Sequence, residues 1–301
     1  MPLDEQRETA LSVIVLSYNV REYLALALRT AEAACREVAA EIIVVDNDSS
    51  DGSAEMVEQE FPAVRLIRSG ANLGFAGGNN LGIEAAEGRY VMILNPDVLV
   101  HPKAFSVLVD CLDENPGVGA VGGRIVNPDG TVDPGARRGF PSPSAAFYRM
   151  VGLSYLFPHS PRFGRYAVSY HDDDSRASVD ALSGCFMCVR REVIEQVGAL
   201  DDEFFMYGED LDWSYRIREA GWEIVYQPEA EIVHFKGEST RTMPRLRQLY
   251  EFHRAMHLFV RKHFAKKLGP LSLAFIETGI LLRGLFVTIW RFAVAGARPA
   301  M

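Results

Sequence analysis

Polar and acidic side chains gather directly after three apolar runs in the first hundred residues of the chain. In sequence order they are Asn19, the loop from Asp46 to Asp51, and Asn95 with Asp97. Carboxylate and amide groups in such places can bind a divalent metal or the hydroxyl groups of a ligand. Turn formation also favours Asn and Asp in loops, so each group taken singly supports either interpretation equally. Three groups together favour a ligand site.

The triplet Asn95-Pro96-Asp97 ends one of these runs. Pro96 prevents a strand from continuing, so the carboxylate of Asp97 would be held rigidly where the strand stops. Such a carboxylate suits a divalent metal that also holds a diphosphate. The alternative is that Asp97 caps a helix that begins near Pro102.

Residues 72–82, NLGFAGGNNLG, are dense in glycine and asparagine and lead into a predicted helix. Their backbone amides could approach a diphosphate or a sugar closely. The segment fits neither the G-x-G-x-x-G pattern nor the Walker pattern, which argues against a dinucleotide fingerprint and a P-loop.

Three carboxylates, Glu209, Asp210 and Asp212, lie within four residues near the start of another predicted helix. Because they repel one another, a partly desolvated member could have the raised pKa that a general base needs. Asp210 could instead be a helix N-cap. His234 ends a later apolar run, where a single histidine is more often structural than a ligand unless Asp97 lies nearby.

Short β-rich runs alternate with helical segments through the first 125 residues. The predicted strands are 11–17, 41–46, 64–69, 90–95 and 118–123, and the predicted helices are 21–38, 53–60, 78–87 and 102–114. The strands are continuously apolar, which indicates burial on both faces and hence an α/β fold with a mainly parallel sheet. In such a sheet, ligands bind at the carboxyl ends of the strands, where the polar groups fall. Residues 127–178 lack a period and are predicted to form an irregular flap over the sheet edge.

The composition, 301 residues with 48% hydrophobic side chains, allows a sizeable core. The four cysteines are too scattered for a disulfide framework, and the N-terminal ten residues lack the apolar core of a signal peptide, so we expect a cytoplasmic protein. We expect Cys185 and Cys188 to be core thiols rather than zinc ligands.

The net charge of -9 is unevenly spread, because residues 241–267 are strongly basic within an acidic chain. This pattern predicts an anionic partner near that end, such as a membrane surface or a phosphate-bearing substrate, and disfavours nucleic acid. The apolar segment 268–296 is interrupted by Glu277, Arg283 and Arg291. We therefore expect no membrane span of about 20 residues there, but a helix that lies in a membrane interface or packs in an oligomer.

Taken in order, six motifs resemble the family 2 glycosyltransferases of the GT-A fold, and within them the rhamnosyltransferase-like branch. The motifs are VIVLSYN (13–19), VVDNDSSDGS (44–53), NLGFAGGNNLG (72–82), LNPDV (94–98), GALDDEFFMYGEDLDWSYRIREAGW (198–222) and EIVHFKGEST (231–240). The resemblance implies a GT-A catalytic domain over residues 1–240. Residues 241–301 would then form a basic and amphipathic helical C-terminal extension.

The resemblance also implies roles for single residues in an inverting, metal-dependent transfer from a nucleotide diphosphate sugar. Asp210 matches the catalytic base, and Asp97 and His234 match ligands of a divalent cation, Mg2+ or Mn2+. Asp46 would bind the nucleotide base. The full set expected to bind the nucleotide sugar is Asn19, Asp46, Asp51, Asn72, Gly74, Gly78, Asn79, Asn95 and Arg216. Asn95 stands where the family has an Asp, and its neutral oxygen leaves most of the metal binding to Asp97 and His234.

The branch points to dTDP-rhamnose as donor and to a lipid-linked or cell-envelope glycan as acceptor, at the cytoplasmic face of the membrane. Two other functions compete with this one. A nucleotidyltransferase would need a Gly-rich, Lys-containing activation loop, which nothing in the sequence matches. A non-catalytic module that binds nucleotide sugar or glycan would keep Asp46 and tolerate the loss of Asp210.

Overall fold

The structure of the chain is a computed structural model that describes residues 9–140, 156–157, 160, 172–238, 241 and 243–296, with side chains up to residue 289. Most of the segment 127–178, predicted as an irregular flap, lies outside these residues.

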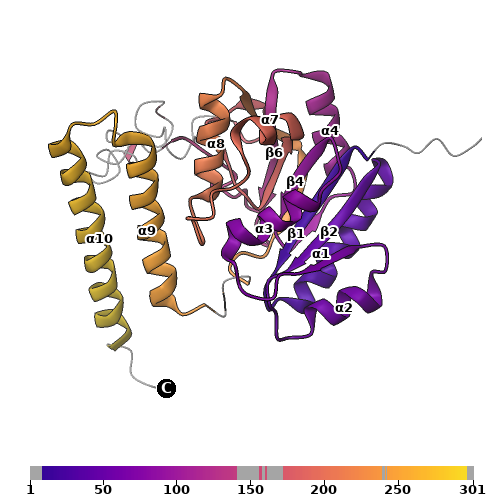
Figure 1. Ribbon diagram of the computed structural model, residues 1–301, viewed down its shortest axis with the longest axis horizontal. Coiled ribbons are helices and arrows are strands. Elements are labelled where there is room, and N and C mark those ends of the chain that lie inside the picture. The colour runs from indigo at the N-terminus through magenta and orange to yellow at the C-terminus, as the bar shows by residue number, and fades with distance from the viewer. Residues whose placement is uncertain are drawn as a thin grey trace, which may run out of the picture.

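Strands and helices alternate through the first half of the chain (Figure 1). They are β1 (Leu11–Ser17), α1 (Arg21–Ala34), β2 (Ala40–Asp46), α2 (Ser53–Glu60), β3 (Arg65–Arg68), α3 (Gly74–Ala85), β4 (Tyr90–Leu94), β5 (Val98–Val100), α4 (Ala104–Glu114) and β6 (Val118–Val126). All predicted strands and helices of this region are present. The short strand β5 was not predicted, and α3 begins four residues earlier than expected, at Gly74.

Within the described residues of the second half, five strands and two helices precede the C-terminal extension. They are β7 (Arg137–Arg138), β8 (Ala177–Ser178), β9 (Ala181–Leu182), β10 (Phe186–Arg190), α7 (Arg191–Val197), α8 (Glu209–Glu219) and β11 (Glu223–His234). Cys185 and Cys188, at β10, are buried and free, as expected of core thiols.

The main sheet has the strand order β3-β2-β1-β4-β10-β6-β11-β5, with β8 beside β11. Strands β3, β2, β1, β4, β6 and β11 run in one direction, and β10, β5 and β8 run against them. The mainly parallel character is therefore confirmed, although the antiparallel strand β10 separates β4 from β6. Every residue of β1 and β4 is buried, as the continuous apolar runs predicted.

Helix α3 packs closely against β1 because two glycines, Gly78 and Gly82, face the strand. A Cβ atom on Gly78 would lie 2.4 Å from Cδ1 of Leu16, and one on Gly82 would lie 2.4 Å from Cγ2 of Ile14. The glycine-rich sequence thus serves close packing of helix on sheet here, as well as the loop that precedes it.

The C-terminal extension is a hairpin of two helices, α9 (Arg245–Phe264) and α10 (Pro270–Gly296), which stands beside α8 (Figure 1). Helix α9 buries Ala255 and Phe259 in a cluster with Phe204 and Tyr215. The predicted domain boundary near residue 240 therefore falls between β11 and a helix that shares a core with the catalytic body.

Helix α10 contacts α9 and is otherwise exposed along most of its described length. In the described part of the chain, it is the helix that is long and apolar enough to cross a membrane, over Pro270–Ile289. The interruptions at Glu277 and Arg283 do not break the helix, so the expectation that the apolar segment is too short for a span was wrong on length.

Candidate active site

A cavity of about 310 Å³ opens at the carboxyl ends of β1, β2, β4 and β11. Its wall contains five residues of the predicted site: Asn72, Gly74, Asn95, Asp210 and His234. A second cavity, of about 300 Å³, is lined by His101, Arg124 and Asp174 among others and contains none of the predicted residues. The first cavity is therefore the candidate active site.

The pairing of β5 with β11 brings Asp97 to His234. His234 stands opposite Val98 in this antiparallel pair, and the backbone N–H of Phe235 donates to the carbonyl of Asp97 at 2.9 Å. Oδ1 of the buried Asp97 lies 3.2 Å from Nε2 of His234. Helix α4 has no side-chain cap at its N-terminus, so Asp97 is not the cap that the alternative interpretation required.

The electrostatics of this corner suit a cation. Desolvation opposes protonation of His234, but the Asp97 carboxylate and the Cys185 thiol outweigh it and raise the histidine pKa to about 10. Nδ2 of Asn95 lies 3.4 Å from the same ring nitrogen, which leaves Oδ1 of Asn95 buried with no hydrogen-bond partner among the described residues. A cation bound here would be stabilised by the Asp97 carboxylate and could be coordinated by Oδ1 of Asn95.

Within the described ranges, no group of three or more His, Cys, Asp or Glu side chains is arranged to hold a metal. The corner offers instead one carboxylate, one imidazole and the amide oxygen of Asn95. This set fits a hard divalent cation that takes its other ligands from water and substrate phosphates, as Mg2+ commonly does.

Asp210 lies in the first turn of α8 on the same cavity. Its Oδ2 accepts a hydrogen bond from the backbone N–H of Gly184 at 2.9 Å and forms an ion pair with the guanidinium of Arg138. Its Oδ1 accepts the N–H of Leu211 at 2.7 Å. The N-cap of α8 is Gly208, so Asp210 is not the cap that was considered as an alternative.

The raised pKa expected among the three carboxylates falls on Glu209. Burial raises the pKa of Glu209 from 4.5 to about 8, and the negative charge of Asp210 adds to the effect. The side chain lines the cavity, and its Oε2 has no hydrogen-bond partner among the described residues. The chain enters α8 through Tyr207 and Gly208, both with positive φ angles of 70° and 83°.

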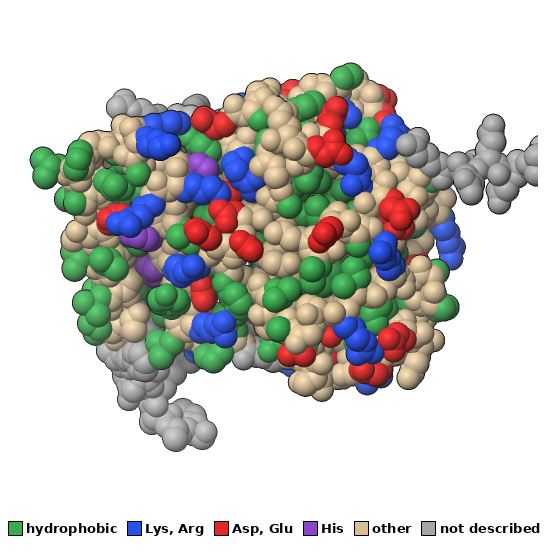
Figure 2. Space-filling model, in the orientation of Figure 1, with side chains coloured by type: hydrophobic (Ala, Val, Ile, Leu, Met, Phe, Trp, Pro, Cys, Tyr) green, Lys and Arg blue, Asp and Glu red, His purple; other side chains and the backbone are tan. Residues whose placement is uncertain are grey.

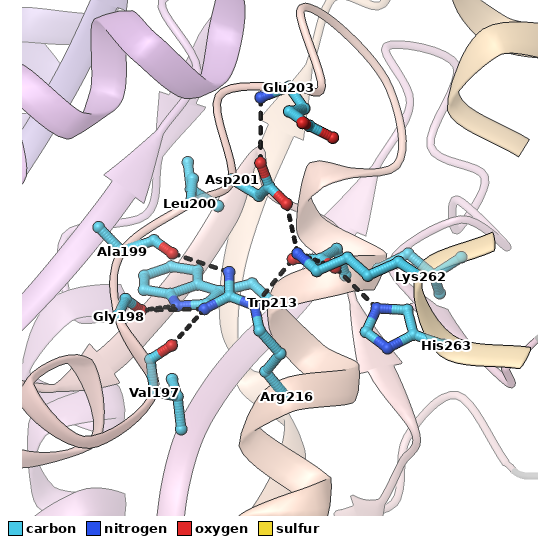
Figure 3. Close-up of polar contacts among 12 residues, drawn as sticks. Val197, Gly198, Ala199, Leu200, Asp201, Glu203, Trp213, Arg216, Lys262 and His263 are labelled. Atoms are coloured by element: carbon cyan, nitrogen blue, oxygen red, sulfur yellow. Dashed lines mark hydrogen bonds and ion pairs between the residues drawn. The ribbon is translucent and has the colours of Figure 1, made fainter. Parts of the chain in front are cut away.

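Asp212 does not line the cavity; it is buried in an ion cluster whose partners Arg216, Lys262 and His263 are labelled in Figure 3. It accepts hydrogen bonds from Nε2 of His263 at 2.7 Å and Nε of Arg216 at 2.8 Å, and Nζ of Lys262 lies 2.8 Å away. Burial alone would raise the pKa of Asp212, but the hydrogen bonds from His263 and Lys262 and the positive charges of Arg216 and Lys262 lower it from 3.8 to about 2. The cluster ties α9 to the helix that carries Asp210.

Arg216 does not lie at the site, which corrects its predicted role in binding the diphosphate. Besides Asp212, its guanidinium donates to the backbone carbonyls of Val197 at 2.6 Å and Ala199 at 2.7 Å (Figure 3). It is absent from the cavity wall. The arginine at the cavity is Arg138 of β7, which sequence reasoning missed because it lies within residues 127–178, a segment without a recognisable period.

The predicted nucleotide-binding loops meet at the other end of the cavity. Asp46 ends β2 and is buried; its Oδ2 accepts the N–H of Ser49 at 3.1 Å, and its Oδ1 has no partner within the described residues. Asn47, which was not singled out, lines the cavity and joins two loops, since its Nδ2 donates to Asn72 Oδ1 at 3.2 Å. Because Asn47 lies inside the motif VVDNDSSDGS, that motif could have identified it from the sequence.

Gly74 shapes the wall of the cavity. Its φ of +76° is a left-handed conformation, and a Cβ atom there would lie 2.4 Å from the carbonyl oxygen of Phe205. The next backbone N–H, of Phe75, donates to that oxygen at 2.7 Å. This bond joins the loop before α3 to the loop before α8.

Four other predicted binding residues make contacts that serve the fold, and none of them lines the cavity. Asn19 accepts the N–H of Ser50 at 2.8 Å, and Asp51 accepts the N–H of Arg21 at 2.9 Å and of Ser53 at 3.0 Å. Gly78 is a helix-packing position, and Nδ2 of Asn79 donates to the carbonyl of Phe75 at 2.9 Å. These contacts give the four residues roles in the fold, and their part in donor binding stays a prediction.

Comparison with known proteins decides the family. The model of a family described as "Glycosyltransferase like family 2" matches residues 9–250. The chain belongs to glycosyltransferase family 2. The matched range of this glycosyltransferase runs from β1 into α9 and includes every residue that lines the cavity described above.

Two curated relatives cover most of the glycosyltransferase. It is 34% identical to an N-acetylglucosaminyl-diphospho-decaprenol L-rhamnosyltransferase of Mycobacterium tuberculosis, over 83% of each chain. It is 25% identical to a low-salt glycan biosynthesis hexosyltransferase of Haloferax volcanii, over 82% of this chain and 75% of the relative. The predicted resemblance to the rhamnosyltransferase-like branch is confirmed.

Solved structures show the GT-A fold. A mannosyltransferase of Pyrobaculum calidifontis, in complex with GDP-Man and Mn2+, matches 99% of the glycosyltransferase and 78% of its own chain, with a TM-score of 0.56 and 19% identity. GalNAc-T7 with UDP, GalNAc and Mn2+ matches 76% of this chain and 44% of its own, with a TM-score of 0.54 and 16% identity. The predicted fold class is confirmed.

Proposed function

We propose that this glycosyltransferase transfers rhamnose from dTDP-rhamnose, with inversion, to a hydroxyl group of a lipid-linked or cell-envelope glycan. The observation that carries the proposal is that Asp210 and His234, which contacts Asp97, line one cavity at the carboxyl ends of the strands. The name of the mycobacterial relative supports both the sugar and the lipid-linked acceptor.

The donor would bind across the loops that follow β1, β2 and β4. Oδ1 of Asp46 is a buried acceptor without a partner among the described residues, which suits an N–H group of the nucleotide base. Asn47 and Asn72 present further polar groups to the cavity beside it. We therefore propose that the base lies at the β2 end and the diphosphate toward Asn95.

Asp97, His234 and the Oδ1 of Asn95 would hold a divalent cation, Mg2+ or Mn2+. When bound, such a cation offsets the charge that grows on the leaving diphosphate. The Mn2+ in the solved structures of the two neighbours supports this cofactor. Arg138, at the same cavity, adds a positive charge that Arg216 cannot supply.

Asp210 would act as the general base. It takes a proton from the acceptor hydroxyl while that oxygen attacks the anomeric carbon from the face opposite the diphosphate, and this geometry gives inversion. The backbone N–H groups of Gly184 and Leu211 fix the orientation of the carboxylate. A positioned base typically contributes about 10²- to 10⁴-fold to the rate.

The test is a panel of nucleotide sugars with Mn2+ present, read by thermal stabilisation and by transfer to a lipid-linked acceptor. A donor at about 100 times its Kd stabilises the fold by about 2.7 kcal/mol, so the correct donor should raise the melting temperature most. We expect dTDP-rhamnose to do so, and both EDTA and Asp97→Ala to abolish transfer. Transfer undiminished by EDTA or by Asp97→Ala would contradict the metal site, and a larger shift with another sugar would replace rhamnose.

We also propose that α10 attaches the protein peripherally to the cytoplasmic face of the membrane. Large apolar side chains stand out from this helix, among them Leu271, Phe275, Leu282 and Phe286, and Figure 2 shows hydrophobic side chains along the edge of the molecule that α9 and α10 form. Much of the basic charge expected to face lipid is used internally, because Lys262 pairs with Asp201 and Asp212 and Arg261 pairs with Glu277. Apolar contact therefore dominates the proposed attachment.

Point variants test the membrane proposal better than a deletion, because α9 shares a core with α8. The variant Leu271→Asp with Phe275→Asp should lose binding to anionic liposomes in a flotation assay. Leu26→Asp, at an exposed leucine of α1, is the matched control. Unchanged flotation of the double variant would contradict membrane attachment, and a change in its oligomeric state would support packing of α10 between subunits instead.

A further inference from the structure

One carboxyl group at the cavity has no part in the reaction proposed above. Glu209 precedes the proposed base directly and is 6% exposed, yet its side chain reaches the cavity wall. Its Oε2 has no hydrogen-bond partner among the described residues. A buried polar atom without a partner is costly, so a group that enters the cavity is expected to satisfy it.

The surroundings of Glu209 favour its neutral form. The titratable and charged groups near it are Asp210 and Asp212 on α8, Arg138 on β7, Tyr207 before α8, and His234 and Cys185 across the cavity. Burial and the charge of Asp210 raise its pKa to about 8. At neutral pH the group is therefore a carboxylic acid, with one O–H donor and one carbonyl acceptor.

Hydroxyl groups of a sugar are the natural partners of such an acid, because each can accept its proton in a hydrogen bond and donate to its carbonyl oxygen. Because Glu209 lies beside Asp210, we infer that the acceptor sugar, rather than the donor sugar, supplies these hydroxyl groups. The hydroxyl that attacks must lie at Asp210, so a second hydroxyl of the same acceptor ring falls within reach of the adjacent residue.

We propose that Glu209 determines acceptor specificity by hydrogen bonding to a second hydroxyl of the acceptor sugar, next to the hydroxyl that Asp210 deprotonates. The acceptor is then a sugar with two neighbouring free hydroxyl groups. This inference rests on the proposed function. Glu209 keeps its proton throughout and forms no covalent bond.

The test compares an acceptor with its deoxy analogue, which lacks the hydroxyl next to the attacked one. The wild-type enzyme should prefer the parent acceptor by roughly tenfold or more in kcat/KM, because the analogue leaves the carboxyl unpaired. Glu209→Ala should reduce this ratio to about one. Glu209→Gln should restore part of it, since the amide can both donate and accept. Glu195→Gln, at an exposed position of α7, is the control and should keep the wild-type ratio.

A pH profile gives an independent readout if Glu209→Ala fails to fold. Above about pH 8, ionised Glu209 loses its donor, so the acceptor KM of the wild-type enzyme should rise. Glu209→Gln, which cannot ionise, should show no such rise, and the donor KM should be unaffected in both.

Two results would overturn the inference. One is a parent-to-deoxy ratio in Glu209→Ala equal to that of the wild-type enzyme. The other is an acceptor KM with the same pH profile in the wild-type enzyme and in Glu209→Gln. Failure of the proposed function looks different, because no transfer would then be seen with any acceptor.

Discussion

The buried ion cluster around Asp212 yields a quantitative prediction for Asp212→Asn. The substitution keeps the shape of the side chain and removes its charge, which leaves Lys262 and His263 of α9 beside a neutral amide. The side chain of Asp212 is fully buried, so solvent screens these interactions little.

The size of the effect follows from the carboxyl group itself. Its pKa is lowered from 3.8 to about 2 in the folded protein. At 1.36 kcal/mol per unit, the favourable interactions of the charged form amount to about 2.5 kcal/mol. Breaking a buried pair typically costs about 3–5 kcal/mol, but Lys262 keeps Asp201 as a partner. We therefore expect Asp212→Asn to lower the free energy of unfolding by about 2–3 kcal/mol at pH 7.

The sign of the pH dependence is also fixed. Because the folded-state pKa is depressed, the contribution of Asp212 is fully present above about pH 4 and is lost as the pH falls toward 2. The gap between wild type and variant should therefore narrow over that window.

Urea denaturation followed by tryptophan fluorescence measures this effect, since the buried Trp213 is the next residue and its Nε1 donates to Gly198 at 2.9 Å. Asp202→Asn, at an exposed carboxylate of the same region, is the matched control and should change stability by less than about 0.5 kcal/mol. Equal stability of Asp212→Asn and this control at pH 7 would show that the charge of Asp212 does not stabilise the fold.

Two further variants test how loops are fastened at the cavity. Gly74→Ala should destabilise the protein by about 2 kcal/mol or more and weaken donor-induced stabilisation. The reason is that the left-handed backbone disfavours a side chain and the Phe205 carbonyl oxygen lies 2.4 Å from the new Cβ. A thermal shift assay measures both effects, and an unchanged melting temperature would show that the two loops can separate freely. Asp51→Ala should lower the free energy of unfolding by about 1–2 kcal/mol, because this carboxylate accepts N–H groups at the starts of α1 and α2. It should leave kcat/KM for the donor near the wild-type value, and a large rise in donor KM would instead show that Asp51 binds the donor.

Most of the first half of the fold could be predicted from the sequence, because strands such as β1 and β4 are buried along their whole length and read as nearly unbroken apolar runs, whereas the short strand β5 was not predicted. Strand β10 was harder to interpret. Its residues 186–189 are also apolar, but an apolar run does not show whether a strand pairs in a parallel or an antiparallel direction. The antiparallel position of β10 between β4 and β6 therefore depends on tertiary pairing.

The candidate site, like the fold, could be predicted only in part from the sequence. Asp97 and His234 could be connected from motifs, and the pairing of β5 with β11 explains their contact. Arg216 could not be placed, because an arginine in a helix serves equally well to bind a phosphate or the carbonyls of a neighbouring loop. The neutral state of Glu209 depends on burial, which the sequence of three adjacent carboxylates does not specify. Arg138 reaches Asp210 only through the pairing of β7 with β9.

We propose that Asp210 removes the proton from the acceptor at this cavity. The most direct measurement is the turnover of Asp210→Asn with dTDP-rhamnose, Mn2+ and a lipid-linked acceptor, together with donor-induced thermal stabilisation of the same variant. We predict that turnover falls by about 10²- to 10⁴-fold while stabilisation by the donor is retained. Near-wild-type turnover in Asp210→Asn would show that Asp210 is not the general base.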